Sequence, residues 1–114
     1  MTHVTDVTDA TFDTEVLAAD PDLPVLVKFT ADWCAPCRQL GPVLRSIAEE
    51  EGDHLKIVRI NVDHNPETTL RHGVLATPTL MLFRAGEPLK SMVGARPKRL
   101  LLKELADVLP PLRP

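Results

Sequence analysis

The chain has 114 residues, with 13 lysines and arginines against 16 aspartates and glutamates, which gives a formal charge of −3 when histidine is neutral. This length supports one domain with a substantial core, because a chain of this size buries roughly two-thirds of its unfolded surface. Hydrophobic residues at 44% and charged residues at 25% exclude wholesale disorder, collagen-like repeats and coiled coils, and the slight acidity argues against nucleic acid or an anionic membrane as the main partner.

The first third of the chain predicts two strands and a helix. Residues 4–6 suit a short strand, and residues 8–19 suit a helix with an apolar stripe at helical spacing. That stripe consists of Phe12, Val16 and Leu17. Residues 25–29 form a β-rich, nearly continuous apolar run, which is typical of a central strand covered on both faces. Lys28 is the one charge within that run.

The middle of the chain continues the alternation of helix and strand. Apolar and small residues recur at helical spacing from residue 34 to about residue 51, and Gly52 follows. Pro42 lies inside this predicted helix, so we expect a kink there. Residues 55–62 suit a second long strand. The next segment, residues 65–73, predicts a short helix that Asn-Pro opens and glycine closes.

The last third predicts a hairpin and a final helix. Residues 79–83 and 89–93 suit two strands joined by a turn at 85–88. Residues 97–109 suit a helix, whose apolar face consists of Leu101, Leu105, Val108 and Leu109. The order of strands and helices predicts an α/β fold. We expect one domain over residues 1–109, followed by a short proline-rich and frayed C-terminal tail over residues 110–114.

Cys34 and Cys37 are the only cysteines, and their CxxC spacing indicates chemistry rather than structural stapling. Cys34 lies between a predicted strand end and a predicted helix start, where backbone amides and the helix dipole favour a thiolate. We therefore expect Cys34 to be the nucleophile and Cys37 to resolve a mixed disulfide, with Pro36 restricting the loop between them. The predicted reaction is reversible dithiol-disulfide exchange.

Two other interpretations of the cysteine pair are an inert pair of thiols and half of a zinc site. Zinc needs two more ligands, and no two of the four histidines have the spacing of a zinc finger. The histidines are His3, His54, His64 and His72. We predict no metal site.

The first residues carry neither a basic nor an apolar targeting region, and no apolar run approaches the ~20 residues of a membrane span. We therefore expect a cytoplasmic protein without a membrane partner, in which a disulfide is catalytic and transient.

Several motifs together resemble the thioredoxin family. They are Trp33-Cys34-Ala35-Pro36-Cys37, Thr77-Pro78-Thr79 and Val93-Gly94-Ala95, together with Phe12-Asp13, Pro42, Asn61-Val62-Asp63, Asn65-Pro66 and Phe83-Arg84-Ala85-Gly86-Glu87. The resemblance spans nearly the whole chain. It implies a thioredoxin fold, with a central mixed β-sheet of about five strands flanked by about four helices and the redox pair at the start of a kinked helix. It also implies that Pro78 is a cis-proline facing the disulfide, although the sequence alone leaves the isomer open.

The same resemblance implies a flat, mostly uncharged substrate-binding surface around Cys34. Its residues are Trp33, Ala35, Pro36, Thr77, Pro78, Val93 and Gly94. The Thr77 backbone is expected to pair with an extended substrate segment. The implied function is reduction of protein disulfides by an electron carrier that maintains cell redox homeostasis. No cofactor is expected on this chain, which has no glycine-rich dinucleotide loop. Electrons are expected from NADPH through a flavoprotein thioredoxin reductase, and we expect a monomer.

Two residues depart from the common thioredoxin pattern. Ala35 stands where glycine is usual, and alanine favours helix by up to ~1 kcal/mol, so we expect a retuned potential with retained exchange. Lys28 stands where the family carries a buried aspartate, and Arg59 stands where the partner lysine is usual. A buried ammonium must reach solvent, find a carboxylate or lose its proton, with Asp32 and Asp63 as candidate partners.

Three consequences of Lys28 remain open at the sequence level. A charged Lys28 near the sulfurs stabilises thiolates and shifts the pair toward oxidising potentials. A neutral Lys28 accepts the proton of Cys37. A Lys28 that extends to solvent leaves proton transfer to water. The alternatives to a reductase are a more oxidising oxidase or isomerase and a redox-independent binding or holdase role, which would survive Cys34→Ser.

Overall fold

Five strands form one mixed sheet in the computed structural model, which describes residues 4–109. The strands are β1 (Thr5–Asp6), β2 (Val25–Thr30), β3 (Lys56–Asn61), β4 (Thr79–Arg84) and β5 (Glu87–Val93). Their spatial order is β1-β3-β2-β4-β5. The pairs β1–β3 and β2–β3 are parallel, whereas β2–β4 and β4–β5 are antiparallel. The predicted α/β fold with a mixed five-stranded sheet is confirmed.

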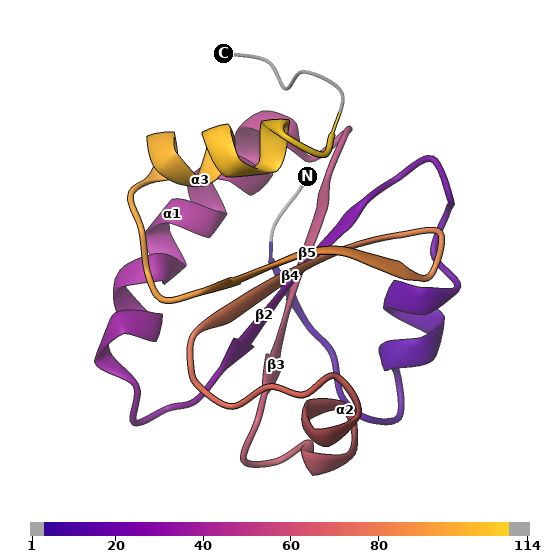
Figure 1. The fold of residues 1–114 in the computed structure, drawn as a ribbon, viewed down its shortest axis with the longest axis vertical. Helices are drawn as coiled ribbons and strands as arrows, with labels where there is room; N and C mark the ends of the chain where they lie inside the picture. Colours follow the sequence, from indigo (N-terminus) through magenta and orange to yellow (C-terminus); the bar gives the residue numbers. More distant parts are fainter. Residues whose placement is uncertain (1–3, 110–114) are drawn as a thin grey trace.

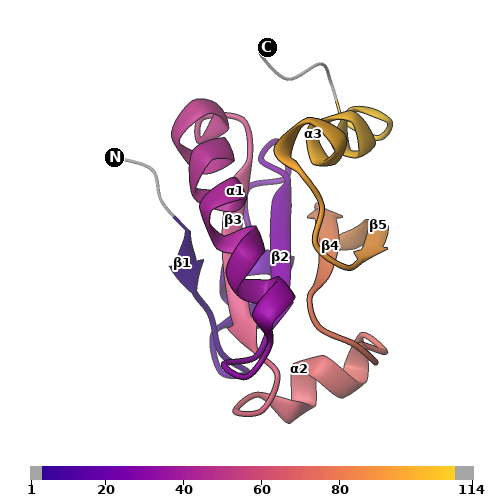
Figure 2. The ribbon, with the colours of Figure 1, turned by 90° about the vertical axis from the view of Figure 1, so that its left-hand side faces the viewer.

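Helices cover both faces of the sheet (Figure 1). They are α1 (Ala35–Glu51), α2 (Pro66–Arg71), α3 (Lys98–Ala106) and a short π-helical segment, η1 (Asp13–Leu17). Figure 2 shows α1 and α3 together on one face, with α2 at one end of the sheet. No helix within residues 4–109 is long and apolar enough to cross a membrane.

The central strand β2 is buried on both faces, as its apolar run predicts. Leu26 belongs to the core beneath α1 and α3, whereas Val27 and Phe29 belong to the core beneath η1. The alternation follows from strand geometry, because successive side chains point to opposite faces. A rigid β2 therefore ends at a fixed point, from which the loop to α1 departs.

An aromatic cluster fills the core on the η1 face. The ring of His72 lies 5.2 Å from the ring of Phe12 and 5.3 Å from that of Phe83, and the two phenylalanine rings are 5.7 Å apart. Burial lowers the pKa of His72, the nearby Arg71 guanidinium lowers it further, and Asp13 opposes them. His72 is therefore held toward its neutral form, which suits its apolar surroundings.

The predicted helix at residues 8–19 is longer than the observed one, because the π-helical segment is Asp13–Leu17, preceded by Phe12 in helical conformation. The backbone N–H of Thr8 bonds the hydroxyl oxygen of Thr11 at 2.9 Å, so side-chain bonding stabilises a turn before the helix. The predicted apolar stripe is nonetheless directed inward, since Phe12 and Val16 are buried.

The C-terminal elements also differ from the prediction in their bounds. The hairpin turn is tighter than expected, because Ala85 and Gly86 have φ of 51° and 81° and Glu87 already begins β5. A register shift between Leu82 and Phe83 accommodates the longer strand. Val108 was expected on the buried face of the last helix but is 38% exposed, because α3 ends at Ala106. The predicted tail at residues 110–114 lies outside the described residues.

Candidate active site

The site lies at one edge of the sheet, where the ends of several strands meet. Phe29 of β2 pairs with Thr79 of β4, and Thr79 also pairs with Val93 of β5. The loop after β2, the residues before β4 and the residues after β5 therefore converge. The sequence topology thus brings the motifs around residues 33–37, 77–79 and 93–94 to one edge.

Cys34 and Cys37 form a disulfide, with their Cα atoms 5.2 Å apart. Cys34 is the N-cap of α1, and the backbone N–H of Cys37 donates to the Cys34 Sγ at 3.2 Å. Pro36 lies in the first turn, where its missing N–H costs no helical hydrogen bond. The amides of the first turn and the positive helix end are thus directed toward Cys34, as the sequence predicts.

Trp33 is a surface residue rather than a core aromatic, with 69% of its area exposed. Its indole Nε1–H donates to the Asp63 carboxylate at 2.8 Å. Asp63 follows β3, so a hydrogen bond between two loops fixes an exposed apolar ring beside Cys34. The sequence does not predict this contact, because thirty positions separate the two residues.

The Thr77–Pro78 peptide bond is cis, as the family resemblance implies. In the described part of the chain, the backbone N–H and C=O of Thr77 take no hydrogen bond. Pro78, which was expected on the substrate-binding surface, is buried, and its carbonyl accepts from the Gly94 N–H at 2.9 Å. Val93 is 62% exposed, and Gly94 adopts φ of 99°, a conformation that suits glycine. An unpaired backbone segment therefore lies beside exposed apolar side chains.

Arg96 is a further residue at this edge that sequence reasoning missed. Its Nη2 donates to the Val93 carbonyl at 2.6 Å and to the Gly94 carbonyl at 3.2 Å. Its Nη1 lies 2.7 Å from both carboxylate oxygens of Glu104 on α3. The Arg96 guanidinium thus connects the end of β5 to α3 through hydrogen bonds and an ion pair. The only sequence signal is the eight-residue spacing of two opposite charges.

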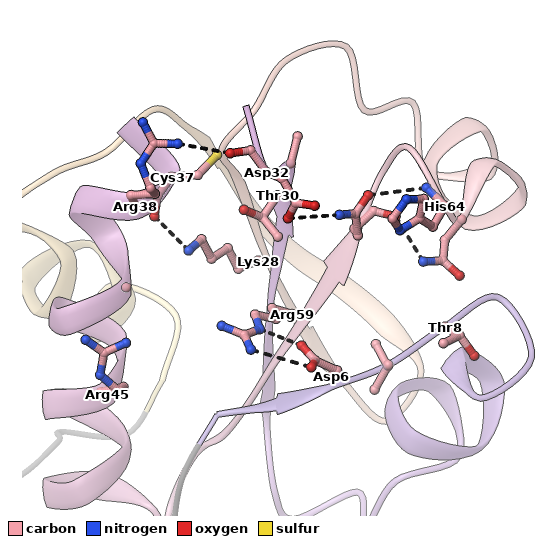
Figure 3. Close-up of a pocket in the computed structure, with 15 residues that line it drawn as sticks. Asp6, Thr8, Lys28, Thr30, Asp32, Cys37, Arg38, Arg45, Arg59 and His64 are labelled. Atoms are coloured by element: carbon pink, nitrogen blue, oxygen red, sulfur yellow. Dashed lines mark hydrogen bonds and ion pairs between the residues drawn. The ribbon is translucent and has the colours of Figure 1, made fainter. Parts of the chain in front are cut away.

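Lys28 is buried, with 5% of its area exposed, and its ammonium donates to the Cys37 carbonyl at 2.8 Å (Figure 3). Neither candidate carboxylate partners Lys28: the Asp32 carboxylate accepts from the Asn61 side-chain amide at 3.5 Å, and the Asp63 carboxylate accepts from the Trp33 indole. The Lys28 side chain extends from β2 toward α1, where the Cys37 carbonyl accepts a hydrogen bond from its ammonium.

Burial lowers the pKa of Lys28, and the guanidinium groups of Arg59 and Arg45 lower it further. Arg59 itself pairs with the exposed carboxylate of Asp6 on β1, which raises the pKa of Arg59. The two positions at which the family usually has a buried ion pair are therefore both basic here. Lys28 donates to the Cys37 carbonyl, and Arg59 pairs with Asp6.

The sheet, the capping cysteine and the exposed apolar surface define a thiol-disulfide oxidoreductase. A sequence model of the thioredoxin family matches residues 3–107. A thioredoxin of Mycobacterium tuberculosis is 49% identical over 106 residues, covering 93% of this chain and 90% of that protein. A thioredoxin of Alicyclobacillus acidocaldarius is 48% identical over 102 residues, covering 90% and 94%. The chain belongs to the thioredoxin family.

A third relative carries this domain within a larger protein. The bifunctional thioredoxin reductase/thioredoxin of Mycobacterium leprae is 45% identical over 107 residues, covering 94% of this chain and 23% of that protein. The chain itself is a protein-disulfide reductase by its family and its redox-active cysteine pair.

Proposed function

We propose that Cys34 attacks substrate disulfides and that Cys37 resolves the product. The observation that carries this order is the position of Cys34 at the N-cap of α1, with the Cys37 amide on its sulfur. The Cys34 thiolate forms a bond to one substrate sulfur, and the other substrate sulfur leaves and takes a proton. Cys37 then attacks Cys34, which releases the second substrate thiol and closes the Cys34–Cys37 disulfide. Two electrons pass to the substrate.

The substrate is an extended segment of a disulfide-containing protein, paired with the open backbone of Thr77. Trp33, Val93 and Gly94 supply the surface around it, with the buried Pro78 next to Thr77, and such pairing reads backbone more than side chains. A mostly uncharged surface that recognises backbone can accept many different disulfide-containing proteins. The exposure of Trp33 and Val93, together with the unpaired Thr77 backbone, supports the proposal.

Lys28, Ala35, Pro36 and Pro78 tune the site. The ammonium of Lys28 lies on the backbone of the resolving cysteine, so a positive charge there stabilises a Cys37 thiolate. Ala35 and Pro36 restrict the first turn of α1, and the buried Pro78 lies next to Thr77. Lys28→Met is expected to raise the pKa of the cysteine thiols and to change the exchange rate, measured by thiol alkylation against pH. Unchanged thiol pKa values and an unchanged exchange rate would remove Lys28 from this role.

The electron donor is NADPH through a flavoprotein thioredoxin reductase, and the chain works as a cytoplasmic monomer without a bound cofactor. The bifunctional relative of Mycobacterium leprae joins a thioredoxin reductase to a thioredoxin in its name, which supports a reductase as partner. A coupled assay with purified reductase tests this route. Steady NADPH consumption that depends on a substrate disulfide supports it, and no consumption beyond that of the reductase alone contradicts it.

The decisive experiment is reduction of a protein disulfide by the full chain and its cysteine variants. Cys34→Ser is expected to abolish turnover, whereas Cys37→Ser is expected to accumulate a mixed disulfide with the substrate. Ser91→Ala, an exposed change on β5, is the control and should retain full activity. Accumulation of the mixed disulfide in Cys34→Ser instead would reverse the proposed order.

The reduction potential separates this reductase from its oxidising alternative. In equilibration against a glutathione or dithiothreitol series, a value of about −270 mV, as for thioredoxin, would support a reductase in which Lys28 and Ala35 are tolerated. A value well above about −200 mV would mean that Lys28 and Ala35 make the pair oxidising, and would favour an oxidase or isomerase.

A further inference from the structure

A cavity of about 770 Å³ lies beside Cys37, between α1 and the sheet (Figure 3). Lys28 and Arg59 line it from β2 and β3, where the two residues are register partners and project from the same face. Cys37, Gly41 and Arg45 line it from α1, at successive positions four residues apart on one face of the helix. The cavity therefore has cationic groups on both of its walls.

Gly41 keeps the cavity open in front of these cations. A β-carbon built at Gly41 would lie 3.4 Å from Arg45 Nη1, so a larger side chain would compete with the guanidinium for this space. The cavity extends past Cys37 to a polar end lined by Asp32 and Asn61. Its volume falls in the range of pockets that hold small ligands.

The cationic end carries more positive than negative charge. Among residues 4–109, one ion pair lies at this end of the cavity. It joins Arg59 to Asp6, and the Asp6 side chain is largely exposed. Lys28 is more than nine-tenths buried. Within the described part of the chain, its ammonium has one acceptor, the Cys37 carbonyl, although an ammonium has three donors. Three cations therefore share one carboxylate at this end of the cavity. Lys28 is buried, and buried charges normally have partners, whereas Arg45 and Arg59 are exposed and can turn toward a ligand.

We propose that this cavity binds the phosphate group of a small ligand between Lys28, Arg45 and Arg59. Guanidinium groups match the oxygens of phosphate in pairs, and a buried ammonium adds a point charge. The cavity exceeds what inorganic phosphate fills, so a phosphate monoester extends toward the polar end at Asp32 and Asn61. The site shares Lys28 and Cys37 with the proposed disulfide reduction, but phosphate binding requires no thiol chemistry, so it can be measured without turnover.

Nuclear magnetic resonance of the oxidised full chain tests the site, with inorganic phosphate as the probe and chloride replacing it at constant ionic strength. Saturable shifts are expected at the backbone amides of Cys37, Gly41 and Arg59. Arg45→Gln changes an exposed side chain and should weaken binding at least about tenfold, which corresponds to about 1.4 kcal/mol. Arg99→Gln on α3 removes the same charge elsewhere and should leave the affinity unchanged.

Two further arms complete the experiment. Lys28→Met should also weaken binding at least about tenfold, and folding of each variant is checked by its own spectrum. Glycerol 2-phosphate replaces phosphate in a parallel titration: tighter binding identifies a monoester ligand, and weaker binding identifies free phosphate. Shifts that rise linearly without saturation, or equal affinities of Arg45→Gln and Arg99→Gln, would overturn the proposal.

Discussion

The Arg96 guanidinium joins the end of β5 to α3 through contacts that are largely shielded from solvent. The side chains of Arg96 and Glu104 are 14% and 25% exposed, and the guanidinium also bonds the carbonyls of Val93 and Gly94. A second ion pair nearby, between Lys90 and Asp107, spans 3.3 Å and has an Asp107 side chain that is 69% exposed. The two pairs link the same elements but differ in burial.

We predict that Arg96→Met lowers the free energy of unfolding by about 3 kcal/mol. Charge-assisted hydrogen bonds each contribute about 1.5–3 kcal/mol, but the contacts of one guanidinium are not additive. Breaking a buried pair costs about 3–5 kcal/mol, and residual exposure places this one at the lower end. Asp107→Asn should cost no more than about 0.5–1 kcal/mol, as expected of an exposed ion pair.

Urea unfolding of the oxidised chain, followed by far-ultraviolet circular dichroism, measures both changes. A double-mutant cycle with Glu104→Gln should give a coupling energy of about 1–2 kcal/mol between Arg96 and Glu104. An Arg96→Met cost no larger than that of Asp107→Asn would refute the reasoning. A coupling energy of zero would also refute it, because the loss would then arise elsewhere.

Three further predictions concern the core. Burial lowers the pKa of His72 in the folded chain. As the pH falls through the ordinary range of histidine, the unfolded chain therefore binds more protons than the folded chain does. The free energy of unfolding should consequently decrease from about pH 7.5 to about pH 5. His72→Leu should flatten this dependence in urea titrations, and an unchanged slope would contradict the assignment. Lys28→Met should raise the free energy of unfolding by about 1 kcal/mol at neutral pH, because it removes a buried ammonium. This increase should become smaller at alkaline pH, where the Lys28 of the wild-type chain loses its proton. A gain that does not change with pH would rule out this cause. Phe12→Ala should cost about 3–5 kcal/mol in the same measurement, because Phe12 is fully buried against Phe83, and a cost below about 1 kcal/mol would show that the site collapses around the cavity.

Elements with a strong local pattern could be predicted from the sequence. The apolar run of β2 is confirmed because burial on both faces leaves few alternatives for residues 25–29. The N-terminus of α1 is confirmed because Cys34 and Pro36 suit the cap and first turn. The π-helical η1 could not be predicted, since periodicity does not report the side-chain bond between Thr8 and Thr11.

Contacts between distant segments account for most of what the sequence did not predict at the site. Proximity in sequence suggested Asp32 as a partner of Lys28, but the orientation of β2 under α1 directs the ammonium to Cys37. The bond from Trp33 to Asp63 depends on how two loops meet after the sheet has formed. Such partners depend on three-dimensional packing, which hydrophobic periodicity does not describe.

The two borders of the sheet limit how another chain can extend it. One border, β1, offers only two residues. The other, β5, contains Pro88, which has no N–H to donate, and it lies beside a register shift that interrupts the regular ladder. Lys90 on β5 places a further charge there. A second chain that meets either border therefore finds few free backbone groups to pair with, so β-sheet growth from this domain, including its own association into fibrils, is disfavoured.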